Sequence, residues 1–173
     1  MPKYTKRPRT DFIVIHSAAT DPAWHGDVDI DTVRKWHTDP KPRGNGWDDV
    51  GYHLYIPRNG VIQLGRPLWA MGAHVGGYND QSIGICLEGG AKAITKIVDG
   101  RRVLDYLLPS DDFTENQWSA LRIITASMVI KYPDAEVLGH RDFPGVTKAC
   151  PGFDARSWWE IARPAELIGP EDG

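Results

Sequence analysis

Short apolar runs recur along the chain between polar stretches that contain glycine and proline, and they predict an alternation of strands and helices. The run from Phe12 to His16 is apolar up to its final histidine and has the length of a buried strand. Ser82 to Leu87 has the same character, and Glu136 to His140 is a shorter run of this kind. We therefore expect all three to be strands and the first two to be fully buried.

Helical spacing of apolar positions, together with capping residues, predicts three longer helices. The first covers residues 29–37 and is capped by Asp29. Thr114 to Gln117 is a capping box, and the helix that it opens runs to Tyr132. A closing helix is expected over residues 154–166, interrupted by a proline. The apolar face of the middle helix consists of Trp118, Leu121, Ile124 or Thr125, and Met128.

Turn residues between apolar runs predict two β-hairpins. Tyr52 to Ile56 and Val61 to Leu64 flank a turn in which Asn59 and Gly60 are expected to supply the positive φ angles. A second, peripheral hairpin is predicted in the insertion between Glu88 and Asp112, with strands Ile94–Val98 and Arg102–Leu108 around Asp99-Gly100. Strands mixed with crossing helices predict an α/β layered domain, in which histidines at strand ends face a common crevice.

Length and composition agree with one globular domain. The chain has 173 residues, of which 41% are apolar and 25% charged, and its prolines and glycines are spread out rather than gathered in a linker. We expect a core over residues 12–166, a basic arm over 1–11 and a frayed acidic tail over 167–173. The arm is interpreted as a solvated terminus rather than a docking site.

Charge and hydropathy exclude several classes of partner. A net charge of −3 without a basic face argues against nucleic acid as a partner. The N-terminus lacks the apolar segment of a signal peptide, and no run approaches the ~18 apolar residues of a membrane-spanning helix. We therefore expect a protein that is kept in the cytoplasm and has no membrane partner. Two cysteines do not form a secreted disulfide framework.

The segment Gly139 to Phe153 carries the strongest candidate chemistry. It places His140, Lys148 and Cys150 on one irregular loop, and imidazole nitrogen and thiolate sulfur are preferred zinc ligands. Catalytic zinc usually takes three protein ligands, and His16, at the end of an apolar strand, is the candidate for the third. Lys148 is expected to lower the pKa of the neighbouring thiol and to lie where an oxyanion could develop.

The remaining cysteine and most of the other histidines have simpler interpretations. Cys86 lies inside an apolar strand and is interpreted as a small buried hydrophobe. His25 and His37 are interpreted as structural residues, because a lone histidine beside an apolar run is more often part of the packing than a ligand.

Five ordered segments carry a resemblance to a known family: FIVIHSAAT, DVGYHLYIPRNGVIQLGRP, GAHVGGYNDQSIGICLEGG, TENQWSAL and GHRDFPGVTKACPGFD. From about Phe12 to Trp159 the chain resembles the zinc-dependent N-acetylmuramoyl-L-alanine amidases of type 2. This group includes small phage lysozymes and the peptidoglycan recognition proteins. The resemblance implies a single α/β domain with a central mixed β-sheet flanked by helices, and a groove for the glycan–peptide junction.

The resemblance also implies a role for individual residues. One Zn²⁺ per chain would be bound by His16, His140 and Cys150. Tyr52 and Lys148 match the two catalytic residues of phage members that are not zinc ligands. In the same motifs His74 matches a groove residue that contacts substrate, whereas His53 matches supporting structure.

The implied reaction is hydrolysis of the amide that joins N-acetylmuramic acid to the L-alanine of the peptidoglycan stem peptide. Lys148 and Tyr52 would stabilise the oxyanion, and Tyr52 or a water ordered by it would protonate the leaving amine; Glu88 is a second candidate for proton transfer. A cytoplasmic amidase of this kind fits a monomeric phage endolysin that reaches the wall once a holin opens the membrane, or an autolysin from a prophage. The insertion Glu88–Phe113 and the stretch DFPGVT before Lys148 depart from the pattern of the small phage members, so an accessory role such as binding a phage RNA polymerase does not follow from the resemblance.

Two functions from other classes remain as alternatives. A peptidoglycan sensor would use Trp69, Tyr78 and His74 as contacts without cutting its ligand. A glycosidase would need a pair of carboxylates on either side of the bond that is cut. The motifs that resemble the amidases contain no obvious pair of this kind.

Overall fold

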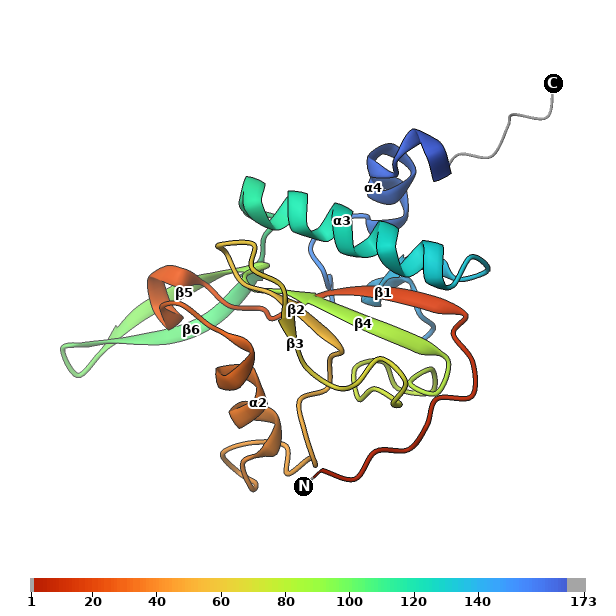
Figure 1. The fold of residues 1–173 in the computed structure, drawn as a ribbon. Coiled ribbons are helices and arrows are strands. Elements are labelled where there is room, and N and C mark those ends of the chain that lie inside the picture. The colour runs from red at the N-terminus through yellow and green to blue at the C-terminus, as the bar shows by residue number, and fades with distance from the viewer. Residues whose placement is uncertain (1, 168–173) are drawn as a thin grey trace.

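A computed structural model describes residues 2–167, and a five-stranded mixed sheet forms its centre (Figure 1). The strand order is β3-β2-β4-β1-β7, with β1 parallel to β4 and β7, β2 parallel to β4, and β3 antiparallel to β2. Their bounds are β1 Phe12–Ser17, β2 Leu54–Ile56, β3 Gln63–Leu64, β4 Ser82–Leu87 and β7 Glu136–Gly139. The expected strands are therefore present, except that His140 follows β7 as the first residue of a short 3-10 turn, η1 (His140–Asp142).

Helices cover both faces of the sheet. Helix α3 (Glu115–Lys131) crosses one face with α4 (Ala155–Ala162) beside it, and α2 (Ile30–Thr38) lies on the other side (Figure 1). On β1, Ile13 and Ile15 belong to the cluster that packs against α3, so the alternate residues Val14 and His16 face the opposite side. Coverage of both faces explains why these strands read as continuous apolar runs.

The helices begin where their capping residues predict. Asp29 caps α2 through the backbone N–H of Thr32, and Thr114 forms the expected capping box with Gln117 at the start of α3. On the buried face of α3, Leu121, Thr125 and Met128 are enclosed, whereas Trp118 and Ile124 are partly buried. The closing helix α4 ends at Ala162, and a 3-10 turn, η2 (Ala165–Leu167), follows the proline. A four-residue helix, α1 (Pro22–His25), follows β1.

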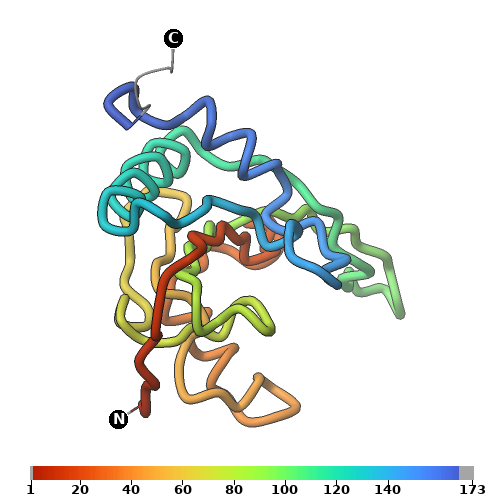
Figure 2. The backbone as a smooth tube through the Cα atoms, turned by 90° about the vertical axis from the view of Figure 1, so that its right-hand side faces the viewer, coloured from red at the N-terminus to blue at the C-terminus, as the bar shows by residue number. Residues whose placement is uncertain are grey.

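Both predicted hairpins are present, with one correction to a turn. At the β2–β3 turn only Gly60 has a positive φ, of 80°, whereas Asn59 does not; its side chain instead accepts a hydrogen bond from the N–H of Val61. The second hairpin, β5 (Ala91–Val98) and β6 (Arg101–Pro109), forms a separate two-stranded sheet. This β5–β6 hairpin projects from the body of the molecule (Figures 1 and 2).

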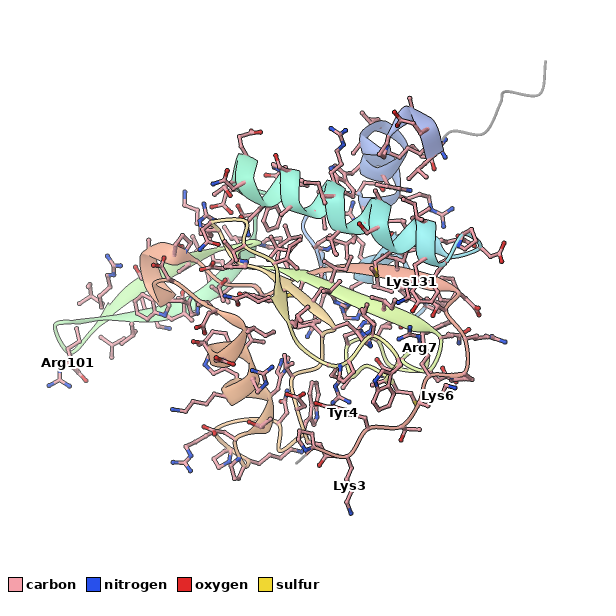
Figure 3. The ribbon with its side chains drawn as sticks, in the orientation of Figure 1. Lys3, Tyr4, Lys6, Arg7, Arg101 and Lys131 are labelled. Atoms are coloured by element: carbon pink, nitrogen blue, oxygen red, sulfur yellow. The ribbon has the colours of Figure 1, made fainter. Side chains whose placement is uncertain are left out.

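The N-terminal arm is docked on the body, which corrects the expectation of a solvated terminus. The Tyr4 hydroxyl donates to Asp49 at 2.5 Å, and Arg7 is only 7% exposed, with its guanidinium donating to the carbonyl of Ala70. Lys6 forms an isolated antiparallel bridge with Ala70, whereas Lys3 points away from the body (Figure 3). The partners lie more than 40 residues away in sequence, so local composition did not reveal them.

The expected frayed tail lies almost entirely outside the described residues. Among the helices of residues 2–167, none combines the length and the apolar character needed to cross a membrane.

Candidate metal centre

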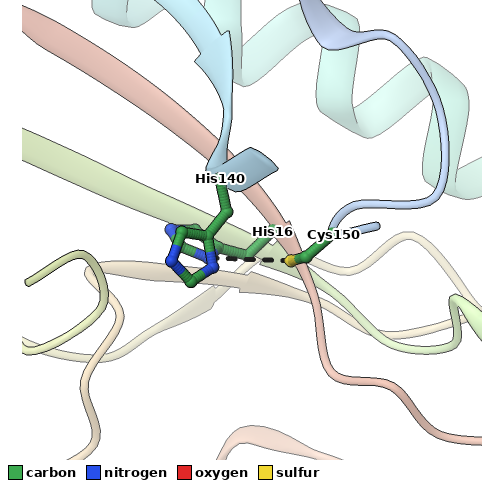
Figure 4. Close-up of side chains that lie close together, drawn as sticks. All are labelled: His16, His140 and Cys150. Atoms are coloured by element: carbon green, nitrogen blue, oxygen red, sulfur yellow. Dashed lines mark hydrogen bonds between the residues drawn. The ribbon is translucent and has the colours of Figure 1, made fainter. Parts of the chain in front are cut away.

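The register of the parallel strands brings the two candidate histidine ligands together. Ile15 of β1 lies opposite Gly139 of β7, so His16 and His140 follow at the same edge of the sheet. Their ring centroids are 4.6 Å apart. The Cys150 Sγ lies 3.9 Å from Nδ1 of His16, and one donor atom from each of the three residues lies within 4.8 Å of the others (Figure 4).

Contacts with the sheet hold Cys150 in place although it belongs to a loop. The backbone N–H of Ser17 donates to the Cys150 Sγ at 3.3 Å, and the N–H of Arg141 donates to the Cys150 carbonyl at 2.9 Å. At Gly139 a Cβ would come within 2.9 Å of the Pro151 ring, so the chain after Cys150 packs directly on the end of β7. Ser17 was not a candidate from the sequence, and its position next to His16 at a strand end is the signal that could have found it.

Burial sets the protonation of the histidine donors. Desolvation lowers the pKa of His16 well below its ordinary value and also lowers the pKa of His140, where the charge of Lys148 adds to the effect. Both rings are therefore neutral at neutral pH, which is the form that binds a metal.

The pKa of the Cys150 thiol is raised, whereas the sequence predicted a lowered one beside Lys148. Burial raises its pKa, although the hydrogen bonds from Ser17 and the charge of Lys148 oppose the shift. Lys148 therefore does not make this group a ready thiolate, because desolvation has the larger effect. A metal ion bound beside it would stabilise the thiolate directly. Two neutral imidazoles and one thiol at this spacing fit zinc, which accepts mixed nitrogen and sulfur ligands in a tetrahedral site.

A cavity of about 500 Å³ opens over the three donors. Tyr52 and Lys148 line it together with all three candidate ligands, so the structure brings these five predicted residues to one place. Burial raises the pKa of the Tyr52 hydroxyl well above its ordinary value, with smaller contributions from the two cysteines, and this group remains a neutral donor. The lining also includes residues that the sequence did not single out: Ala18, Ala19, Gly90, Ala91, Leu107, Pro109, Thr147 and Ala149.

His74, which the resemblance assigns to the groove, lies behind a candidate metal ligand. It does not line the cavity; it is buried behind His16, and its Nδ1 lies 3.0 Å from Nε2 of that ring. In this position the His74 ring contacts His16, a candidate metal ligand. The sequence motifs did not distinguish a histidine that contacts substrate from one that supports His16. That difference depends on which side of the His16 ring the side chain occupies in the fold.

The other candidates have structural roles. Glu88 is 2% exposed, its carboxylate accepts hydrogen bonds from the N–H groups of Val28 and Arg58, both at 2.8 Å, and it does not line the cavity. Trp69 packs edge-on against Tyr4, away from the cavity. Tyr78 likewise lies outside the lining, beside Phe143.

The remaining histidines bond to the backbone, as expected for structural residues. His37 accepts a hydrogen bond from the N–H of Gly51, and His53 accepts one from the N–H of Gly84. Among the described residues that line the cavity there is no carboxylate, so the pair that a glycosidase needs is missing there.

Comparison with known proteins agrees with this geometry. A family profile described as N-acetylmuramoyl-L-alanine amidase matches residues 6–153. The endolysin of Klebsiella phage KP32 is 37% identical over 158 residues, which are 91% of each chain. Among solved structures, the Ph2119 endolysin from a Thermus scotoductus bacteriophage superposes with a TM-score of 0.66 at 22% identity, covering 93% of this chain and 90% of that one.

A further solved structure has the same fold and carries a ligand. The Y78F mutant of Drosophila PGRP-LB, in complex with tracheal cytotoxin, matches with a TM-score of 0.61 at 22% identity, covering 92% of this chain and 85% of that one. These likenesses confirm the expected mixed sheet with flanking helices. The family profile and the identity to the KP32 endolysin show that the chain belongs to the N-acetylmuramoyl-L-alanine amidase family and is an amidase.

Proposed function

We propose that this protein is a zinc-dependent endolysin that hydrolyses the amide between N-acetylmuramic acid and L-alanine in peptidoglycan. The observation that carries the proposal is the convergence of His16, His140 and Cys150 at the floor of a cavity that Tyr52 and Lys148 also line. A binding module would need no cluster of three metal donors, and its expected contacts Trp69, Tyr78 and His74 lie outside the cavity lining.

The three candidate ligands, Lys148 and Tyr52 each have a task that follows from their positions. Zinc held by the two imidazoles and the thiolate would activate a water molecule and polarise the scissile carbonyl. Lys148 donates a hydrogen bond to the oxygen that becomes negative during attack, and removal of such a donor typically costs about 3 kcal/mol. Tyr52 remains a neutral phenol overall, and it passes the proton that the attacking water loses to the leaving amine, directly or through a second water.

The choice of peptidoglycan is supported by the relatives. The KP32 protein is named an endolysin, and the PGRP-LB structure holds tracheal cytotoxin. For this chain we infer that a muropeptide occupies the cavity, with the amide carbon over the three donors. We further infer that a monomer accumulates in the host cytoplasm and reaches the wall after a holin opens the membrane.

Digestion of purified sacculi by the purified protein tests the proposal. We expect about one zinc per chain, turbidity loss that stops with a chelator and returns with zinc, and newly exposed N-terminal alanine in the products. New reducing sugar ends would instead indicate a glycosidase. Binding to sacculi without any new amine, or full activity of the metal-free protein, would overturn the proposal.

A further inference from the structure

His74 is buried against the candidate ligand His16 and has no task in the chemistry described above. The two rings lie edge to face, with centroids 5.0 Å apart and an interplanar angle of 88°. The backbone N–H of His74 donates to the Asn79 side chain at 2.8 Å, which fixes the loop that carries it. The packing therefore places this ring in one orientation.

Two glycines leave the space that the ring occupies. A Cβ on Gly72 would lie 2.3 Å from the Cδ2 of His74, and a Cβ on Gly84 would lie 2.7 Å from its Cγ. Neither glycine has a left-handed φ, so the backbone conformation does not require glycine at these positions. Gly84 lies on β4 two residues before Cys86, which is the register partner of His16. The lack of a side chain at Gly72 and Gly84 therefore leaves room for the His74 imidazole directly beside His16.

His16, His74 and Ser82 form a chain of hydrogen bonds that ends at the carbonyl of Tyr78. The direction of each bond follows from that carbonyl. The Ser82 hydroxyl donates to the carbonyl of Tyr78 at 2.7 Å, and a carbonyl only accepts. The single hydroxyl hydrogen is then used, so Ser82 Oγ accepts from Nε2 of His74, 3.4 Å away. A neutral imidazole carries one N–H, and the Nδ1 of His74 is therefore an acceptor.

The same reasoning assigns the tautomer of the ligand. The Nε2 of His16 lies 3.0 Å from the Nδ1 of His74 and must donate to it. The hydrogen of His16 is then on Nε2, and the lone pair of Nδ1 faces the Cys150 Sγ at 3.9 Å. A ligating histidine ordinarily passes its second N–H to a carboxylate, a carbonyl or water. Here a second imidazole and a serine take that place.

We propose that His74 and Ser82 are positioning residues, which hold His16 in the tautomer that presents Nδ1 to the metal. The proposal rests on the zinc site of the proposed function and deepens it. Loss of such a supporting partner lowers metal affinity by about 10- to 100-fold. Metal affinity, rather than the catalytic step on the loaded protein, is the quantity that should change.

Zinc affinity of matched variants, measured by competition with a chromogenic chelator, tests this role. His74→Leu fills similar space without an acceptor and should bind zinc about 10- to 100-fold more weakly. His74→Asn keeps an acceptor oxygen near the former Nδ1 and should recover part of that loss. Ser82→Ala should weaken binding in the same direction, whereas Ser127→Ala, which removes an exposed serine on α3, should leave it unchanged. Unchanged zinc affinity in folded His74→Leu would overturn the proposal.

Nitrogen-15 NMR of the histidine rings gives a readout that does not depend on how the variants fold. In wild-type protein, with and without zinc, Nε2 of His16 should carry the proton and should couple across the hydrogen bond to Nδ1 of His74. A proton on Nδ1 of metal-free His16 would overturn the assignment. If the wild-type protein bound no zinc but showed the assigned tautomer, the proposed function would fail while the hydrogen-bond chain stood.

Discussion

The two sides of the cavity are built in different ways. On the sheet side His16 is 1% exposed, lies in a strand paired on both edges and has hydrogen-bonding neighbours at both ring nitrogens. On the loop side Thr147, Lys148 and Ala149 are exposed and extend from an irregular segment. The sheet side determines where a metal can bind. The loop side leaves the charged side chain of Lys148 free to approach substrate. Precise ligand geometry requires a rigid support, whereas a group that contacts substrate must remain accessible.

Cys150 joins the two sides. It belongs to the loop, but its sulfur accepts a hydrogen bond from the N–H of Ser17 at the end of β1. Changes at Cys150 and beside His16 should therefore affect the metal, close packing should make the sheet side sensitive to added atoms, and removal of the exposed Lys148 should affect turnover.

The largest effect is expected for Cys150→Ser. Replacement of the sulfur ligand should abolish both stoichiometric zinc and sacculus digestion, because a neutral hydroxyl is a poor zinc ligand. Metal analysis after gel filtration and a turbidity assay measure the two losses. Ser127→Ala is the control, since that side chain is exposed on α3 and lies outside the cavity lining. Full zinc content in Cys150→Ser would remove the sulfur from the ligand set.

Lys148→Ala should separate the loop side from the metal. We expect kcat to fall by about 10²- to 10³-fold, because one donor to the developing oxyanion is lost. Zinc content and the unfolding midpoint should remain those of the wild type, because this side chain is exposed. Lys35→Ala, at an exposed position on α2, controls for the loss of one positive charge. Wild-type turnover of Lys148→Ala would contradict the role assigned to the lysine.

Gly84→Ala tests how tightly the sheet side is packed. The added methyl group would meet the His74 ring at 2.7 Å, and overpacking of this kind costs about 1–3 kcal/mol of unfolding free energy. Urea unfolding of the metal-free protein measures the change. A stability equal to that of the wild type would show that the ring can move aside and that the sheet side is less rigid than its packing indicates.

Gly145→Ala makes the corresponding change on the loop side and should have the smallest effect. A Cβ there meets nothing within 4 Å, so the only cost comes from its φ of +78°, about 1–2 kcal/mol for a residue in the left-handed region. The same urea experiment applies, and zinc affinity should be unchanged. A loss larger than that of Gly84→Ala would reverse the contrast between the two sides.

Much of this arrangement could be predicted from local pattern. Interactions within a few residues can be predicted from sequence. They determine the strands β1 and β4, the caps at Asp29 and Thr114, and both hairpins. The three candidate ligands came from donor chemistry and from motif resemblance. Their convergence in the structure agrees with that expectation.

Other features depended on contacts between distant segments. The position of His74 follows from space left by Gly72 and Gly84, and the docking of the N-terminal arm follows from Asp49 and Ala70. The direction of the Cys150 pKa shift depends on how completely the folded chain excludes water.

The sequence by itself therefore determined the secondary elements, the fold class and the chemical types of the site residues, because backbone propensity and ligand chemistry are properties of single residues and their near neighbours. Only the tertiary structure decided which nitrogen of His16 is free, which side of the site a histidine occupies and how burial shifts each ionisable group. Those properties arise because groups far apart in the chain come into contact only when the sheet has formed.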